Sequence, residues 1–192
     1  GENLINPGKD PINNTQFLFF LAAIMKGVDE YADLLRISVA SAGNDHRLGA
    51  NEAPPAIISI FLGEELEAVV NALVEGTDYT SKSGTMFNVG VSSLPSFPKD
   101  STDRNRTSPF AFTGNKFEFR MCGSNLNIAG PNTVLNTIVA DSLKLFADEL
   151  EKADDFQTAL HDLLVKTIKE HRRVIFNGNG YGAEWPVEAE KR

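Results

Sequence analysis

The stretch from Lys116 to Met121 holds charged side chains that could bind both a metal ion and an anion. Two Phe residues alternate there with Lys116, Glu118 and Arg120, which is the two-residue period of a β-strand. On a strand, Glu118 and Arg120 point to the same side, while the Phe side chains point to the core. That side offers an oxygen ligand for a hard cation and a planar fork for a carboxylate or phosphate. Taken alone, however, the alternation favours an ordinary surface ion pair.

Two further polar segments precede this expected strand. The stretch from Gly43 to Pro55 is rich in Gly, Asn and Pro and carries Arg47 and Glu52. The second segment is Arg104-Asn-Arg106, in a region rich in Ser, Thr and Asp. Such compositions favour turns, so both segments are expected to be loops. Singly, each is typical of solvent-exposed charge, and His46, His161 and His171 are likewise expected to be solvated.

Helices are expected to position these segments. Apolar residues recur at helical spacing after Asn14, nearly all round the helix at its start, which predicts a deeply buried helix capped by Asn14 or Thr15. Asp154 or Asp155 is expected to cap the last long helix, and Gly76 to close a short amphipathic one. The expected helices span about 15–35, 64–73, 131–153 and 155–176. Residues 57–61 read as a strand or buried turn, and 37–40 as a short β-tolerant stretch.

Composition narrows the class of protein. The 192 residues are 42% hydrophobic and 23% charged, which suits one globular domain or part of one. The net charge of −8 argues against nucleic-acid or anionic-lipid partners, because both need clustered Lys and Arg. Cys122 is the single cysteine, so no internal disulfide is possible and a cytoplasmic location is expected. The longest apolar run, Phe17 to Met25, is too short to span a bilayer.

The order of the three polar segments is their most specific feature. The order is a loop from Arg-Leu to Glu-Ala-Pro, then Arg-Asn-Arg, then a strand of the form apolar-Glu-apolar-Arg. This order resembles the catalytic domain of glutamine synthetase, and the resemblance covers nearly the whole chain. Three features resemble the type III branch: the residues around Arg47, the long insert before Arg104 and the run from Gly123 to Asn132. The resemblance implies an α+β fold, mostly helical with a few antiparallel strands. Residues 1–192 would be part of one catalytic domain, with a loop insert at about 77–108.

The activity that this resemblance implies is ATP-dependent ligation of ammonia to glutamate. A γ-glutamyl phosphate intermediate would give glutamine, ADP and phosphate, with Mg²⁺ or Mn²⁺ as the metal and a homo-oligomer as the intact protein. By the same resemblance, Arg47 would hold glutamate, Glu52 would favour ammonium binding and its deprotonation, and Arg106 would stabilise the transferring phosphoryl group.

The expected strand would supply three more site residues by resemblance. Glu118 matches a metal ligand near the nucleotide phosphates, Arg120 an arginine at the reacting end of glutamate, and Lys116 a basic nucleotide contact. Two other functions stay open. One is a related γ-glutamyl amide ligase that uses another amine, although the intact Glu-Ala-Pro favours ammonia. The other is a non-catalytic assembly or interaction module.

The resemblance also has gaps. The family often carries an arginine in a Ser-x-Arg-Ile-Pro run after Arg106, whereas Thr107 to Phe112 contains none. The family's other metal-binding residues and its phosphate loop would precede Gly1. The chain lacks an initiator Met and stops in the polar Glu190-Lys-Arg192. We therefore expect it to be a piece of a longer protein and to be inactive alone, because one glutamate cannot bind a metal cluster.

Overall fold

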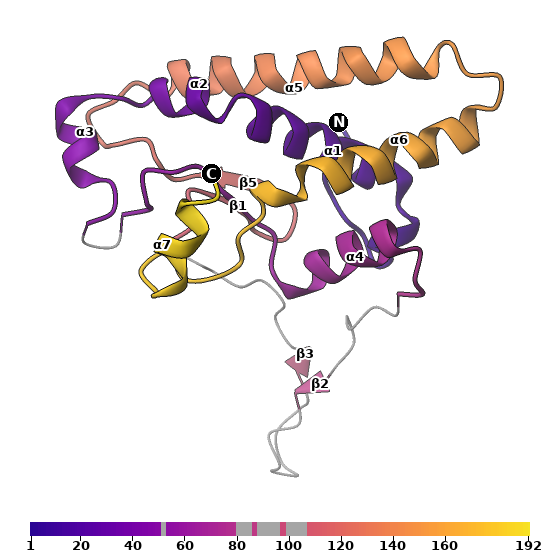
Figure 1. Cartoon of the computed structure of the whole chain (residues 1–192), viewed down its shortest axis with the longest axis horizontal. Helices are drawn as coiled ribbons and strands as arrows, with labels where there is room; N and C mark the ends of the chain where they lie inside the picture. The colour runs from indigo at the N-terminus through magenta and orange to yellow at the C-terminus, as the bar shows by residue number, and fades with distance from the viewer. Residues whose placement is uncertain (51–52, 80–85, 88–96, 99–106) are drawn as a thin grey trace.

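The structure is a computed structural model that describes residues 1–50, 53–79, 86–87, 97–98 and 107–192 (Figure 1). The described residues exclude Glu52 and Arg106, which have expected roles, and Arg104 of the same Arg-Asn-Arg segment. Most of the loop insert expected at about 77–108 also lies outside them. Among the described residues, no helix has the length and apolar character needed to cross a membrane.

The helix α1 (Thr15–Glu30) lies at the centre of the core, as predicted. Asn14 caps it, and its side-chain oxygen accepts a hydrogen bond from the main-chain N of Phe17 at 3.1 Å. Half of its residues are buried, on more than one side of the helix. The expected continuation to residue 35 is wrong, because Tyr31 leaves helical geometry at φ −115° and ψ 28°. A separate helix, α2 (Ala32–Ile37), follows. Ile37, which was expected to begin the β-tolerant stretch 37–40, is therefore the last residue of a helix.

Two long helices, α5 (Ala129–Leu150) and α6 (Phe156–His171), pack against α1 (Figure 1). Both were predicted. The carboxylate of Asp155 caps α6 by accepting hydrogen bonds from the main-chain N of Gln157 and of Thr158. The last predicted helix was too long, because α6 gives way to the 3-10 helix η2 (Arg172–Val174). Gly27 lets α1 approach α5 closely, since a Cβ there would lie 2.9 Å from the carbonyl oxygen of Ile138.

A small mixed sheet lies beside the helices. Its strand order is β1 (Ile60–Phe61), β4 (Phe110–Phe112) and β5 (Phe117–Phe119). β4 and β5 pair antiparallel, with Ala111 opposite Glu118, whereas β1 pairs parallel with β4. The expected α+β fold, mostly helical with a few antiparallel strands, is confirmed, and the parallel pairing of β1 with β4 is an addition to it. The parallel pair arises because the chain leaves the sheet after β1 through α4 (Glu64–Glu75) and returns in the same direction.

Aromatic rings join the sheet to the helices. The rings of Phe110 and Phe117 stack with centroids 4.7 Å apart, and Phe112 lies 5.1 Å from Phe117. Phe112 in turn lies 6.0 Å from Phe17 at the start of α1. Aromatic pairs at these separations add stabilisation beyond the area they bury. The strand that carries Glu118 is thus fixed to the central helix through its neighbour.

The remaining described elements are short. They are η1 (Pro11–Asn13), α3 (Ala42–Arg47), β2 (Met86–Phe87), β3 (Phe97–Pro98) and α7 (Glu184–Ala189). β2 and β3 pair antiparallel with each other. α4 ends as predicted at Gly76, which adopts the left-handed conformation at φ 63°. Gly favours that conformation because it has no Cβ.

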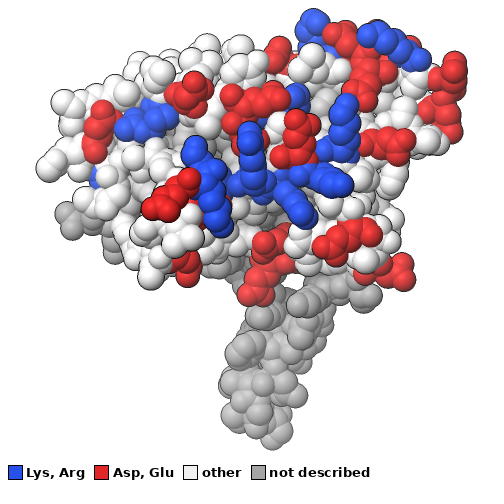
Figure 2. All heavy atoms as spheres, in the orientation of Figure 1, with Lys and Arg blue, Asp and Glu red and all other residues white. Residues whose placement is uncertain are grey.

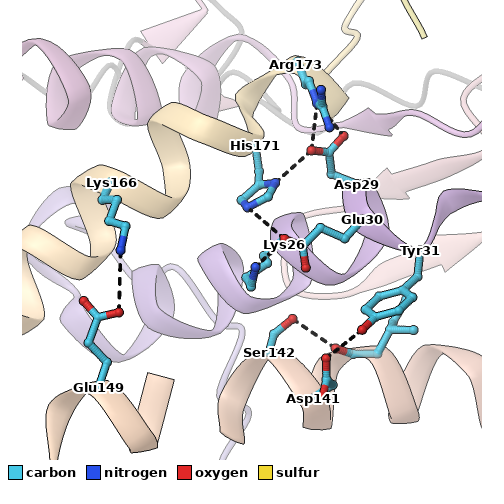
Figure 3. Close-up of polar contacts among 11 residues, drawn as sticks. Lys26, Asp29, Glu30, Tyr31, Asp141, Ser142, Glu149, Lys166, His171 and Arg173 are labelled. Atoms are coloured by element: carbon cyan, nitrogen blue, oxygen red, sulfur yellow. Dashed lines mark hydrogen bonds and ion pairs between the residues drawn. The ribbon is translucent and has the colours of Figure 1, made fainter. Parts of the chain in front are cut away.

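A buried polar cluster joins the end of α6 to α1 (Figure 3). The His171 side chain is 3% exposed, and its Nδ1 lies 2.8 Å from Oδ2 of Asp29. Arg173 Nε donates to the same carboxylate at 2.9 Å. The prediction that His171 is solvated is therefore wrong. Asp29, the partner of His171, lies 142 residues away in the sequence. The charged residues next to His171 indicated an exposed helix face instead.

Acidic and basic side chains lie interspersed on the face that Figure 2 shows, with Lys and Arg gathered near its centre. Several of the cations near the C-terminus are paired with carboxylates. Arg173 pairs with Asp29, and both Lys191 and Arg192 pair with Glu188. These pairs neutralise local charge, and their carboxylates are largely shielded from solvent, since Asp29 is 10% and Glu188 19% exposed.

Replacing Gly27 by Ala should destabilise the fold. The new methyl group would press on the Ile138 backbone, which cannot move as a side chain would. We expect the free energy of unfolding to fall by about 1–3 kcal/mol, although Ala is the better helix former. Gly43→Ala in α3 is the matched control, because nothing lies within 4 Å of its added Cβ. Urea unfolding that finds Gly27→Ala as stable as Gly43→Ala would contradict this close packing.

Asp29 should make stability depend on acid pH. Burial of its carboxylate acts to raise its pKa, but hydrogen bonds from His171 and Arg173 together outweigh burial and hold the pKa below its ordinary value of 3.8. The ionised carboxylate therefore stabilises the fold above the unfolded pKa, and this contribution is lost as pH falls through the lower folded pKa.

We accordingly expect Asp29→Asn to be less stable than wild type by about 1–2 kcal/mol near neutral pH. This difference should shrink as the pH falls below the ordinary pKa of 3.8 and through the lower folded pKa. Asp148→Asn, which removes an exposed carboxylate paired with Lys144, is the control and should change stability little. Urea titrations at stepped pH measure both. A difference for Asp29→Asn that stays constant into strong acid would refute this linkage.

Candidate functional site

Arg47 occupies the last position of α3, in a segment expected to be a loop. Ser41 caps this helix, and its hydroxyl accepts a hydrogen bond from the main-chain N of Asn44 at 3.2 Å. The loop expectation is therefore wrong for residues 43–47. Gly and Asn weaken a helix on average, but here the Ser cap and the buried Asn44 side chain hold one short turn in place.

Asn44 links α3 to the chain that follows β5. Its side chain is buried, with 5% of the residue exposed. Its Nδ2 donates to the carbonyl oxygens of Val39 and Met121, each at 2.8 Å, and its Oδ1 accepts from Arg47 Nε at 3.0 Å. Gly123 accommodates this side chain, since a Cβ there would lie 2.8 Å from Oδ1. A buried amide with satisfied donors and acceptor fixes the geometry of the groups around it.

Arg47 reaches the same stretch of main chain. Its Nη2 donates to the carbonyl oxygen of Met121 at 3.2 Å and lies 3.4 Å from that of Arg120. Two of the predicted substrate-binding residues therefore lie next to each other, although they are 73 residues apart in the sequence. Within the residues that the structure describes, Arg47 forms no ion pair, so no carboxylate there neutralises its charge.

Glu118 and Arg120 meet on one side of the strand, as their spacing predicted. Arg120 Nη2 lies 3.1 Å from Glu118 Oε2, and Lys116 Nζ lies 3.6 Å from Oε1. Thr113 Oγ1 donates to Oε1 at 3.2 Å. The Arg120 hydrogen bond is the main reason why the pKa of Glu118 lies below its ordinary value. Burial opposes it, while Thr113 and the nearby cations Arg120 and Lys116 lower the pKa further.

The ion pair between Glu118 and Arg120 also fits the simpler interpretation of the strand. The Glu118 side chain is 40% exposed, as expected for a charge on the accessible side of a half-buried strand. Phe117 and Phe119 are partly buried and pack against the hydrophobic core. The geometry is therefore compatible both with a surface pair and with a carboxylate that is ionised and available to a cation.

The described residues contain no cluster of three or more His, Cys, Asp or Glu side chains that could hold a metal ion. A hard divalent cation takes about six oxygen ligands, several of which can be water or phosphate. Among the predicted site residues in the described ranges, Glu118 is the one with a carboxylate. It could supply one ligand of such a site, and further protein ligands would have to come from elsewhere.

The predicted residues thus fall into two groups. One group lies on two adjoining segments: α3 carries Arg47, and β5 with the residue on either side carries Lys116, Glu118 and Arg120. Glu52 and Arg106 lie outside the described residues, so their predicted roles stay predictions.

Sequence reasoning missed two features of the site region. The sequence pattern predicts no role for Asn44, although its buried side chain is what joins Arg47 to Met121. The run from Asn177 to Gly180 predicts only the end of the last long helix. In the structure this run leads into Tyr181, whose hydroxyl donates to the carbonyl oxygen of Ala53 at 2.7 Å. The density of Gly and Asn around one Tyr was the signal for an ordered turn.

Comparison with known proteins gives one consistent family. Residues 159–192 match the glutamine synthetase C-terminal domain. The whole chain is 52% identical to the type-3 glutamine synthetase of Dictyostelium discoideum, over 26% of that protein. It is 48% identical to a glutamine synthetase of Butyrivibrio fibrisolvens and 43% identical to that of Bacteroides fragilis strain YCH46, over 27% of each.

The chain spans about a quarter of the length of these curated relatives, and all of it takes part in each match. The identity is too high and too extended to reflect shared composition. The resemblance inferred from three short polar segments is therefore confirmed at the level of family. The chain belongs to the glutamine synthetase family.

Proposed function

We propose that this chain contributes part of the active site of an ATP-dependent glutamate–ammonia ligase. The observation that carries the proposal is the adjacency of Arg47 to the Arg120–Met121 main chain, with Glu118 two residues before. The reaction would pass through γ-glutamyl phosphate and give glutamine, ADP and phosphate. Phosphoryl transfer of this kind depends mainly on positioning and charge stabilisation, which arginines, glutamates and a divalent metal provide.

Arg47 would bind the glutamate substrate. Its Nε and Nη2 are held by Asn44 and by the Met121 carbonyl, which fixes the plane of the guanidinium. A fixed guanidinium loses little conformational freedom when a carboxylate binds it. Its uncompensated charge within the described region adds electrostatic attraction. Arg120 lies alongside and would contact the reacting end of the same substrate.

Glu118 would bind Mg²⁺ or Mn²⁺ near the nucleotide phosphates. A metal ligand must be deprotonated, and the lowered pKa of Glu118 keeps it ionised at neutral pH. Arg120, whose Nη2 lies 3.1 Å from Glu118 Oε2, would stand beside this metal ligand and contact the substrate. Lys116, whose side chain is 65% exposed, is placed beside Glu118 and would contact the nucleotide.

Glu52 and Arg106 complete the proposed set from their positions in the family motif alone. Glu52 would favour ammonium binding and accept its proton, and Arg106 would stabilise the transferring phosphoryl group. The remaining metal ligands would come from other parts of a longer polypeptide, in keeping with relatives about four times as long as this chain. We also propose that the complete enzyme acts in the cytoplasm as a homo-oligomer.

Glutamine formation by the full-length polypeptide that carries this chain tests the proposal. Removing the negative charge at the metal with Glu118→Gln should lower kcat by about a hundredfold or more, since even residues behind the ligands cost ten- to a hundredfold. Asp148→Asn is the control for loss of an exposed carboxylate and should keep full activity. The 192-residue chain alone should be inactive. Glutamine made by that chain above its own Glu118→Gln control would overturn the expected dependence on other segments.

Arg47→Lys should weaken glutamate binding specifically. Lys keeps the positive charge but lacks the fork that pairs with a carboxylate through two hydrogen bonds. We expect the KM for glutamate to rise about ten- to a hundredfold, with the KM for ATP changing much less. Arg36→Lys is the matched control, because Arg36 lies close by in sequence but pairs with Asp45. Steady-state kinetics in which both variants shift the KM for glutamate alike would argue against the role of Arg47.

A further inference from the structure

The turn from Asn177 to Gly182, between η2 and α7, is ordered by its own hydrogen bonds. The Asn179 side-chain oxygen accepts from the main-chain N of Tyr181 at 2.9 Å, and its carbonyl accepts from Gly182 N at 2.9 Å. Glu184 Oε1 accepts from Asn179 N at 3.1 Å. These bonds give the turn a defined shape although it consists largely of Gly and Asn.

The turn is attached to the end of β1. The side-chain oxygen of Asn177 accepts from the main-chain N of Leu62 and of Gly63, each at 2.9 Å. Phe176, just before the turn, packs on Trp185 with ring centroids 5.0 Å apart. The N-terminal end of the turn is therefore fixed both to the sheet and to α7.

Two adjacent residues at the tip of the turn hold two separate chain segments. Gly180 N donates to Thr107 Oγ1 at 2.8 Å, and the Tyr181 hydroxyl donates to the Ala53 carbonyl at 2.7 Å. The contact at Gly180 is close, because an added Cβ would lie 3.1 Å from the Thr107 carbonyl oxygen and 3.2 Å from Pro55 Cδ. The turn thus brings Ala53 and Thr107 near each other.

The segment that Tyr181 holds is the one that follows Arg47. Ala50 N donates to the Arg47 carbonyl at 3.0 Å, and Ala53 N to the Ala50 carbonyl at 2.9 Å. Gly49 N donates to the Pro54 carbonyl at 2.8 Å. Consecutive main-chain hydrogen bonds therefore connect the Tyr181 contact to the end of α3, where Arg47 lies.

We propose that Tyr181 and Gly180 are positioning residues for the ligation reaction, which fix the segment after Arg47 and the segment entering β4 against one turn. The inference rests on the proposed function. In the sequence, Glu52 directly precedes Ala53 and Arg106 directly precedes Thr107. The two described residues that the turn holds are therefore the immediate sequence neighbours of both proposed catalytic residues.

Of the two contacts, the Tyr181 hydroxyl can be removed without changing shape. Tyr181→Phe keeps the ring and deletes the hydrogen bond to Ala53. In the full-length enzyme, we expect the KM for ammonium to rise about two- to tenfold, the scale of one hydrogen bond. The KM for ATP should stay within error, because the hydroxyl donates to Ala53, which follows the residue assigned to ammonium.

Tyr31→Phe is the matched control. It deletes a hydroxyl that donates to Asp141 at 2.9 Å between α1 and α5, in the helical layer (Figure 3). Both variants should lower the Tm slightly, but only Tyr181→Phe should change the KM for ammonium. Equal kinetic effects of the two variants, or an unchanged KM for ammonium in Tyr181→Phe, would overturn the inference by assigning Tyr181 a structural role alone.

Amide hydrogen exchange separates this inference from the proposed function. Tyr181→Phe should speed exchange at Gly49 and Ala53, whose amides close the held segment, whereas Tyr31→Phe should not. If the wild-type polypeptide makes no glutamine, the proposed function fails and the exchange data still decide whether Tyr181 holds the segment. Unchanged exchange at both amides in Tyr181→Phe would rule out that contact as a constraint.

Discussion

The buried side chain of Asn44 is the constraint on which the arrangement of the candidate site depends. It joins the turn after α2, the helix α3 and the chain after β5 through three hydrogen bonds of 2.8–3.0 Å. An amide left unpaired in this interior would be costly, so the three segments have one favourable arrangement. That arrangement sets Arg47 beside the Arg120 main chain. The substrate-binding proposal therefore depends on a residue that need not contact substrate.

The helices supply the rigid support that this small polar connection requires. α1 is buried and packs on α5 and α6. The aromatic rings of β4 contact both β5 and the start of α1, and so fix β5 to this helix. The buried pair of His171 with Asp29 then sets where α6 ends and where the following turn begins. From that turn, Tyr181 reaches back to the segment after Arg47. Residues from both ends of the chain thus converge on one region.

Local patterns in the sequence predicted most of the long elements and their caps, because periodicity and capping act within a few residues. They failed where a partner lay far away. The Gly-Asn composition of α3 indicated a loop, since its stabilising contact to Met121 spans 77 residues. His171 looked solvated because Asp29 is 142 residues distant. The order of short motifs identified the family, because that order reflects shared ancestry. It can be recognised without predicting any contact between distant residues. The roles of Glu52 and Arg106 remain predictions.

A crystal structure of the full-length polypeptide with glutamate, a nonhydrolysable nucleotide and Mn²⁺ is the most direct test of the proposed site. We expect a glutamate carboxylate within about 3 Å of the Arg47 guanidinium. We also expect a Mn²⁺ ion bound to a Glu118 oxygen at about 2.2 Å, with the Asn44 contacts retained. Glutamate and metal bound together at a location that touches neither Arg47 nor Glu118 would contradict the assignment.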